Sequence, residues 1–422
     1  MKMRRFYMPV AAGALMVGFM GSCSNSEDPN AGFEELSEDI QLSARSRATA
    51  DQLGEFYTVL TRDMGNYIDR EGENGNFVIS PLSASMVMAM MGNAVEGDLR
   101  QEILDYMGLE DLEGLNELSA TLLNVLPGID RKTRMTMANS VWVNNLYKLN
   151  SEFSGLMESS YMSEINYFNA SDPSGTVKDI NRWCASKTDN KIKGYMDEMN
   201  VDPYLMALLL NAMNFKSEWR IKDLFNESLT KPRPFYGENG ENEVTTMRGQ
   251  ETGLYCYFED GFTYVNVPFG NAAYKFEVVL PDEGKDVRDI THRLVGSLRE
   301  INRMAREYSK VTLELPKFSL ENKVGLNSAL RAGGLKSLDK LNPLSLFTEE
   351  KTGLIQFNQS VMFEVDEKGA KAVAVSSGEL LDSLPGPDPS EPVEIKVNRP
   401  FLFFITERST GVCLVAGRVT DL

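Results

Sequence analysis

The chain of 422 residues has a single histidine, His292, and this limits the chemistry open to it. A Ser-His-Asp or Cys-His nucleophilic site would have to use this side chain, and a zinc site would have only one imidazole. His292 stands beside Asp289, Thr291 and Arg293, a setting typical of a surface residue. No G-x-S-x-G turn and no glycine-rich phosphate loop occurs. The residue types therefore favour no enzyme, and we expect neither a cofactor nor a metal site.

Carboxylates are the most abundant charged groups. The chain has 61 Asp and Glu residues against 43 Lys and Arg residues, which gives a formal net charge of −18. A glycosidase-like acid pair stays open on counting alone, but no spacing points to one. Nucleic acid needs clustered Lys and Arg for its phosphates, and the sequence has no such block. We expect no nucleic-acid partner.

The first residues are typical of an export signal. Lys2, Arg4 and Arg5 precede a run of apolar and small residues from 9 to 20, which is too short to span a bilayer comfortably. The run ends in Gly21-Ser22-Cys23, which resembles a bacterial lipobox with Met20 at a position usually held by Leu. We expect residues 1–22 to be a signal peptide and Cys23 to be lipidated. The alternative is an ordinary cleaved signal followed by an incidental free cysteine.

Lipidation would fix where the protein acts. One lipid and no second hydrophobic span predict a globular body in the cell envelope, anchored outside the cytoplasm at the outer membrane or cell surface. Cys184, Cys256 and Cys413 then remain, an odd number in a long chain, so a disulfide scaffold is not expected. We interpret these three as small buried hydrophobes.

The pattern of elements predicts one α+β domain. Residues 23–48 are polar and are expected to form a flexible tether, with the domain spanning 49–422. Apolar residues recur at helical spacing from Leu53, and Ser80-Pro81 has the residue types of a helix start. Later segments at 311–315 and 361–365 alternate as strands do, and 401–405 and 412–415 are continuously apolar, as in strands covered on both faces. Helices early and strands late indicate large sheets.

Several short motifs follow one another in the order and spacing of one family. They are residues 76–83 (NFVISPLS), 183–192 (WCASKTDNKI), 211–219 (NAMNFKSEW), 315–318 (LPKF) and 395–405 (IKVNRPFLFFI). Together they resemble the serpin family from about residue 49 to the C-terminus. Each motif is weak alone, but their order over nearly the whole chain is specific.

The resemblance implies a fold and an activity. The fold would have three β-sheets surrounded by helices, with an exposed reactive-centre loop after Glu367. The activity would be suicide inhibition of a serine protease, or of a papain-like cysteine protease. The target cuts the loop and stays attached by an acyl bond, while the loop inserts as a new strand in the main sheet. The expected partner is that protease, and the inhibitor would be a monomer. The alternative is a non-inhibitory serpin that acts as a binding protein.

A loop that inserts needs one face that a sheet can bury. From Ala370 to Leu381, alternate positions are small or apolar, and both charges, Lys371 and Glu379, fall on the other face. The resemblance places Ala370 where relatives usually have Thr or Ser, a change to another small uncharged residue. The hinge that we expect to insert comprises Glu367, Lys368, Gly369, Ala370, Ala372, Ala374 and Ser376.

The position of the cut is less sharply defined. Counting from the hinge in the family's manner gives Ser383-Leu384, whereas counting back from the C-terminal motif gives Pro389 as the residue before the cut. Pro385, Pro387 and Pro389 stiffen the later part. We therefore place the scissile bond at Ser383-Leu384, with Leu380 and Leu381 as alternatives.

Two sites beneath the loop also follow from the resemblance. They are called the breach, at the top of the main sheet, and the shutter, at its centre. We expect Glu367 to pair with Lys317 at the top of the sheet. At the shutter Gln359 stands where many relatives have a histidine, so its hydrogen bonds could survive without sensitivity to pH. The expected breach and shutter residues are Lys317, Trp219, Asn211, Ser80, Ser83 and Gln359.

Overall fold

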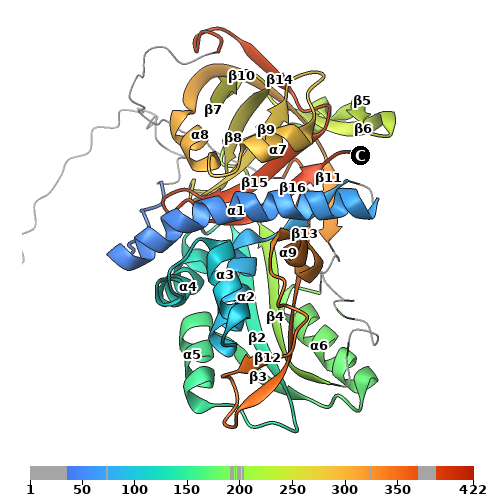
Figure 1. The fold of residues 1–422 in the computed structure, drawn as a ribbon. Coiled ribbons are helices and arrows are strands. Elements are labelled where there is room, and N and C mark those ends of the chain that lie inside the picture. The colour runs from blue at the N-terminus through green and yellow to red at the C-terminus, as the bar shows by residue number, and fades with distance from the viewer. Residues whose placement is uncertain are drawn as a thin grey trace, which may run out of the picture. The chain divides into compact units, whose positions relative to one another are not determined.

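A computed structural model gives the fold. It describes residues 36–422, except 73–74, 191–193, 195, 197–200, 202–203, 323–325 and 369–385. Within the compact unit Glu34–Leu422 (Figure 1), helices precede most of the strands along the chain, as the sequence predicts. The helices are α1 Ala44–Glu71, α2 Pro81–Ala94, α3 Asp98–Met107, α4 Glu113–Val125, α5 Ser151–Tyr161, α6 Pro173–Lys187, α7 Val287–Arg293, α8 Leu298–Met304 and α9 Leu326–Gly333.

The first helix begins earlier than expected. Ser43 caps α1 by accepting from the backbone N–H of Ser46. The residues before it already lie on the body, because the Ile40 N–H donates to Ser409 Oγ at 2.9 Å and Ile40 is buried. Arg408 also donates to the Ser37 carbonyl. The prediction that the tether reaches residue 48 is therefore wrong for residues 37–48. A polar composition does not reveal hydrogen bonds to distant residues.

The main sheet has six strands, in the order β11-β13-β4-β2-β3 with β12 paired to β13. Its central strand, β4, is buried on both faces: Leu208, Leu210 and Ala212 belong to the cluster with α6, while Leu209 and Met213 pack in the main core. The strands of this sheet are β2 Arg134–Asn144, β3 Glu164–Phe168, β4 Leu205–Lys216, β11 Phe318–Asn322, β12 Asn342–Leu344 and β13 Lys351–Val365.

The remaining strands form a ten-stranded network, in the order β1-β16-β15-β9-β8-β7-β10-β6-β5, with β14 on β10. Strand β10 changes partner along its length, from β7 near Arg306 to β6 near Glu314, with a register shift after Tyr308. The network thus divides at β10, which gives three sheets in all. Its strands are β1 Phe77–Ile79, β5 Lys231–Gly237, β6 Gly240–Arg248, β7 Thr252–Glu259, β8 Phe262–Pro268, β9 Tyr274–Pro281, β10 Arg306–Pro316, β14 Val393–Lys396, β15 Phe401–Glu407 and β16 Cys413–Val419.

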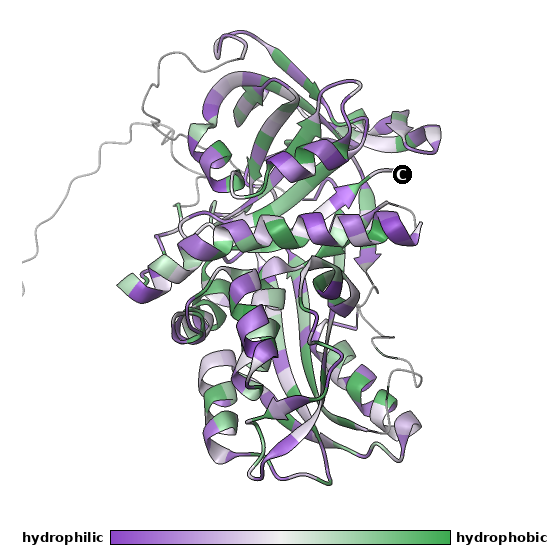
Figure 2. Cartoon of the chain, viewed as in Figure 1, coloured by the Kyte–Doolittle hydropathy of each residue, from purple (hydrophilic) through white to green (hydrophobic). Residues whose placement is uncertain are grey.

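The core explains the hydrophobic runs in the sequence. Helix α2 starts as predicted, with Ser80 as N-cap and Pro81 in the first turn, and nearly all of its residues are buried. Strands β15 and β16 are buried along their whole length. Figure 2 shows apolar residues concentrated on the central strands, with polar residues along the outer faces of the helices. Among the described residues, no helix has both the length and the hydrophobicity needed to cross a bilayer.

Candidate functional site

The structure describes part of the expected site. Glu367 and Lys368 of the hinge and all six breach and shutter residues lie in described segments. Outside the described residues lie Cys23, the hinge residues Gly369, Ala370, Ala372, Ala374 and Ser376, and the candidate cut residues Leu380, Leu381, Ser383 and Leu384. The site is therefore built from what lies beneath and beside the loop.

The central feature is the parallel pairing of β4 with β13, which we call the β4–β13 seam. The ladder runs from Leu354 opposite Leu205 to Val361 opposite Met213. There it stops, although β13 continues to Val365 and β4 to Lys216. The end of β13 pairs instead with β11, where Phe318 lies opposite Val365. The two central strands therefore part at the end of the sheet where the chain leaves for the loop.

The breach lies at this parting. The indole N–H of Trp219 donates to the Asp366 carbonyl at 3.1 Å, and its ring stacks on Phe269 with centroids 4.6 Å apart. One residue further on, Lys317 Nζ donates to Glu367 Oε2 at 2.7 Å, which is the expected contact. The Glu367 side chain is largely buried and that of Lys317 is about one-third exposed. The start of the loop is thus fixed by one backbone contact and one ion pair.

Electrostatics favour the charged form of this pair. Burial alone would raise the pKa of Glu367, but the hydrogen bond from Lys317 and the local backbone together hold it below its ordinary value. The hydrogen bond to Glu367 raises the pKa of Lys317. Both groups are therefore charged near neutral pH.

The shutter is a set of buried polar side chains under the middle of the seam. Gln359 binds both backbone groups of Ser80: its Oε1 accepts from the Ser80 N–H at 3.0 Å and its Nε2 donates to the Ser80 carbonyl at 2.8 Å. Gln359 lies opposite Asn211 in the ladder. Asn211 Nδ2 in turn donates to Asn139 Oδ1 at 2.9 Å, so amides on three adjacent strands form a row.

Some members of the shutter could not be identified from the sequence. Met213 Sδ accepts from the hydroxyls of Ser80, at 3.1 Å, and Ser83, at 3.7 Å. Asn139 connects the row to helix α5 by donating to the Tyr161 carbonyl at 2.8 Å. Nothing in the local sequence marks Asn139 or Met213, because only the strand register places them beside Asn211 and Ser80.

The other end of the loop is also fixed. Strand β14 runs parallel to β10, with Val393 opposite Val311. Upstream of β14, the Ser309 N–H donates to the Pro389 carbonyl at 3.1 Å, and the Ser309 hydroxyl donates to the same oxygen at 3.3 Å. Residues 369–385 therefore connect two fixed points, Lys368 at the breach and Gly386 beside β10.

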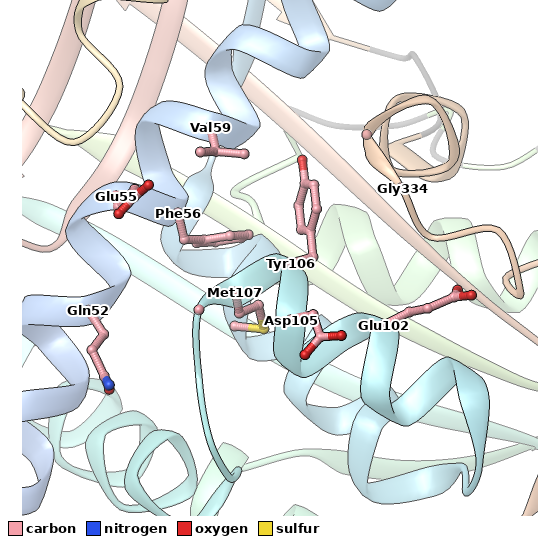
Figure 3. A pocket seen from close by; sticks show the side chains of 11 residues that line it. Gln52, Glu55, Phe56, Val59, Glu102, Asp105, Tyr106, Met107 and Gly334 are labelled. Atoms are coloured by element: carbon pink, nitrogen blue, oxygen red, sulfur yellow. The ribbon is translucent and has the colours of Figure 1, made fainter.

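Three features of the described structure bear on catalysis: a cavity between helices, the single histidine and the thiols. A cavity of about 560 Å³ lies between α1, α3 and the chain after α9 (Figure 3). Phe56 and Tyr106 lie near Glu55, Glu102 and Asp105, and no Ser, Cys or His lines it. His292 is an exposed residue of α7. Cys184, Cys256 and Cys413 are buried free thiols, and burial raises the pKa of Cys184 to about 12.

Comparison with known proteins agrees with this geometry. Residues 57–422 match the family model described as Serpin (serine protease inhibitor). The chain is 29% identical over 360 residues to Iripin-2 of Ixodes ricinus, covering 83% of this chain and 89% of the relative. It is 28% identical over 324 residues to serine protease inhibitor 42Dd of Drosophila melanogaster, covering 75% and 85%.

Solved structures share the fold. The native state of Tengpin, a thermophilic serpin, superposes with a TM-score of 0.76 at 26% identity, covering 93% of this chain and 97% of that one. Native protease nexin-1 with heparin gives a TM-score of 0.77 at 20% identity, covering 89% and 100%. Thyroxine-binding globulin in complex with thyroxine gives 0.73 at 21%, covering 89% and 99%.

Proposed function

Because the chain belongs to the serpin family, whose members are typically protease inhibitors, we propose that it traps extracellular endopeptidases irreversibly through its own loop. The observation that carries this proposal is the early end of the β4–β13 ladder beside Glu367. A strand that enters a sheet must first find unpaired edges. Here both edges are unpaired next to the point where the loop begins.

The size of the seam supports a cut inside residues 380–384. After Glu367 the chain would turn back between β13 and β4 and run antiparallel to both. These strands have 15 and 12 residues. A strand beginning at Ala370 would end at Leu381 if it matched β4, and at Leu384 if it matched β13. The lengths of β4 and β13 and the count from the hinge therefore favour the same residues for the cut.

The trap follows from the order of two bond changes. The target's catalytic hydroxyl or thiol attacks the carbonyl carbon of the scissile bond, and its proton passes through the target's own base to the peptide nitrogen. The C–N bond then breaks, and this nitrogen leaves as the new amino terminus of the downstream piece. The upstream piece is then an ester or thioester of the protease. If the loop inserts before water hydrolyses this acyl bond, the protease moves with the loop and its active site is no longer positioned for hydrolysis. Each ~1.4 kcal/mol on the insertion barrier changes this partition about tenfold.

The loop sequence narrows the target class. No Lys or Arg occurs from Ala372 to Ile395, and Leu380, Leu381 and Ser383 are the candidate residues before the cut. We infer elastase-, subtilisin- or chymotrypsin-like serine proteases, or papain-like cysteine proteases, as targets. Trypsin-like proteases, which need a basic residue at the cut, do not fit.

One experiment tests the proposal directly. The protein is incubated with elastase, subtilisin, chymotrypsin, papain and trypsin, and the products are separated on denaturing gels. A covalent complex with at least one of the first four is expected, and mass spectrometry of the released fragment gives the cut. Clean cleavage by all four, with no complex, would reject inhibition. The nicked protein should also melt well above the intact one, because an inserted strand completes the sheet.

A second candidate function is ligand carriage, as a non-inhibitory serpin. A cavity of about 520 Å³ between α1, α8 and the ends of β9 and β15 favours it, because the cationic side chains Arg47, Lys275, Arg299, Arg303 and Arg408 outnumber the carboxylates Asp51 and Glu277 in its lining. A carrier would melt at the same temperature before and after nicking. That result, together with binding of a small anion by calorimetry, would favour carriage over inhibition.

The place of action is a separate proposal. We infer that the protein is a monomer lipidated at Cys23 and held in the cell envelope, and the residues of the export signal support this. Metabolic labelling with a fatty acid should mark the protein, and Cys23→Ser should abolish both the label and membrane fractionation. Light scattering of the unlipidated body should give the mass of one chain.

A further inference from the structure

The segment 386–391, which we call the anchor, is fixed along β10 although its side chains are largely exposed. Ser309 donates twice to the Pro389 carbonyl, from its N–H and its hydroxyl. Arg306 Nη2 donates to the Pro387 carbonyl at 3.4 Å. Two of the anchor's carbonyls are therefore occupied by the body of the protein.

The start of the anchor fits closely against an aromatic pair. Tyr308 is fully buried, and its ring meets Phe258 edge to face with centroids 5.1 Å apart. Gly386 has a φ of 133°, and a Cβ there would lie 2.9 Å from the Tyr308 hydroxyl and 3.1 Å from Phe258. Both the backbone conformation and the close approach require glycine at this position.

The anchor also has internal order. The Asp388 carboxylate accepts from the Ser390 N–H at 2.9 Å and from its hydroxyl at 2.7 Å. The Glu391 N–H donates back to the Asp388 carbonyl at 3.0 Å, which closes a turn. The hydrogen bonds from Ser390 hold the pKa of Asp388 below its ordinary value. The turn leads the chain into β14.

The anchor accounts for the two conflicting counts of the cut. Position 389, from the C-terminal count, lies six residues after 383, from the hinge count, and it falls within the anchor. We propose that the anchor is an insertion that takes up the extra loop length against β10, keeps its own residues from binding to a protease, and makes Arg306 and Ser309 positioning residues for the bait. This inference rests on the proposed inhibitory function.

The physical reason is the form of peptide that proteases bind. An active site takes an extended segment whose carbonyl and N–H groups are free to pair with it. The carbonyls of Pro387 and Pro389 already accept hydrogen bonds, and their nitrogens have no proton to donate. Releasing the anchor would lengthen the free loop by about a third, which changes loop-closure probability by less than about twofold. The main effect of the anchor is therefore on where the loop is cut.

The test maps cuts made by proteinase K in the full body of the protein. In the wild type every early cut should fall within 369–385. Gly386→Ala and the double variant Arg306→Ala/Ser309→Ala should gain cuts within 386–391, at least about tenfold faster than in the wild type. Lys310→Ala is the matched control, since Lys310 is an exposed neighbour on β10 for which the described structure shows no contact with the anchor. It should give the wild-type map.

Hydrogen exchange at the Ser309 amide provides the second readout, because that N–H donates to the anchor. Exchange should accelerate about tenfold or more in Gly386→Ala, in parallel with the new cuts. The inference is overturned if the wild type is cut within 386–391 as readily as in 369–385. It is also overturned if faster exchange at Ser309 brings no new cuts, or if exchange stays unchanged in both variants.

The cut map separates this inference from the inhibitory proposal. Cut positions are read whether or not a covalent complex forms. A protein that forms no complex but shows the expected map would retain the anchor and lose the inhibitor. A protein that forms complexes but is readily cut within 386–391 would support the inhibitory function and refute the role of the anchor.

Discussion

Two strand pairs at the centre of this protein are built from similar residues and held in different ways. In the pair β15–β16, the antiparallel ladder runs from Phe401 opposite Val419 to Thr406 opposite Cys413, with one register shift after Ile405. In the β4–β13 seam the ladder stops at Val361 and Met213, short of both strand ends. The β15–β16 pair is bonded along nearly its whole length, and the seam is left unpaired where the loop begins.

The side chains show the same difference. Phe403 of β15 stacks on Phe363 with centroids 5.2 Å apart, and it also contacts Phe276, Phe318 and Phe401. Under the seam the key contacts are hydrogen bonds, from Gln359 to Ser80 and from Asn211 to Asn139. Buried polar contacts contribute less net stability than close packing, because they replace hydrogen bonds to water. The comparison indicates that one strand pair inside the core is held mainly by packed aromatic rings, and the other by buried hydrogen bonds that end short of the loop.

Phe363 also shows which side would stay in place. It belongs to β13, yet it stacks on Phe403 of the other network, and β13 pairs with β11 at its end. The C-terminal end of β13 therefore packs against the aromatic core and pairs with β11. Opening the seam would therefore move β4 with β2 and β3 away from β13.

The largest effect is expected from a charge on the buried face of the inserting strand. Ala372→Arg would place an unpaired cation inside the main sheet, at a cost of several kcal/mol. We expect formation of the covalent complex to fall by about a hundredfold or more and the variant to be cleaved as a substrate, with the melting temperature of the intact protein unchanged. Lys371→Arg, on the opposite face, is the control. Undiminished complex formation by Ala372→Arg would refute insertion of this face.

A substitution in the β15–β16 pair should change the stability of the protein without a separate effect on loop insertion. Phe403→Ala removes the centre of the aromatic stack and should lower the free energy of unfolding by about 3–5 kcal/mol. Denaturant titration measures it. Ser409→Ala, in the turn between β15 and β16, is a milder control. If Phe403→Ala lowers the free energy of unfolding no more than the shutter variant Gln359→Leu described next, the two strand pairs are not held differently.

At the shutter, Gln359→Leu leaves the buried N–H of Ser80 without its partner and removes one of the two donors to the Ser80 carbonyl, which still accepts from the Ala84 N–H. We expect a loss of about 1–3 kcal/mol in the free energy of unfolding. We also expect faster loop insertion, seen as a lower barrier to complex formation. Gln359→Glu keeps the size of the side chain and the acceptor for the Ser80 N–H but removes the amide donor, so it separates the contributions of the two hydrogen bonds. A faster-inserting variant with unchanged stability would contradict the role of these bonds in closing the seam.

At the breach, Glu367→Lys replaces the ion pair to Lys317 with two like charges. The start of the loop should then separate from the top of the sheet, and other molecules could pair with the exposed edges of the seam. We expect polymers on mild heating, measured by size-exclusion chromatography. Glu364→Lys, on strand β13 just before Glu367, is the control. A Glu367→Lys protein that stays monomeric and fully active would show that the pair does not protect the edge.

The smallest effect is the pH dependence of the same pair. The pKa of Glu367 in the folded protein lies below the ordinary value of 4.5, so its contribution is complete above about pH 4.5 and is lost as the pH falls through the lower value. Melting temperatures between pH 3 and 8 should show this acid-limb loss, and Glu367→Gln should remove part of it. Because Gln359 does not titrate, we expect no change at the shutter between pH 5 and 8.

The sequence by itself determined the class of the fold and many of its parts. Ser80-Pro81 marked a helix start, and the apolar runs at 401–405 and 412–415 marked strands covered on both faces, because these signals are local in the chain. The ion pair between Glu367 and Lys317 was found from the motif order. The tether was placed too far along because its contacts come from Arg408 and Ser409, at the opposite end of the chain.

Tertiary structure alone decided where the main sheet can open and where the loop is fixed. The end of the ladder at Val361 depends on the register between strands about 150 residues apart in sequence. The row from Gln359 through Asn211 to Asn139 depends on the same pairing. Likewise, Pro387 and Pro389 read as stiff loop residues until β10 supplies the donors Arg306 and Ser309. Composition and spacing report local preference, whereas hydrogen bonds between distant strands are set only when the chain is folded.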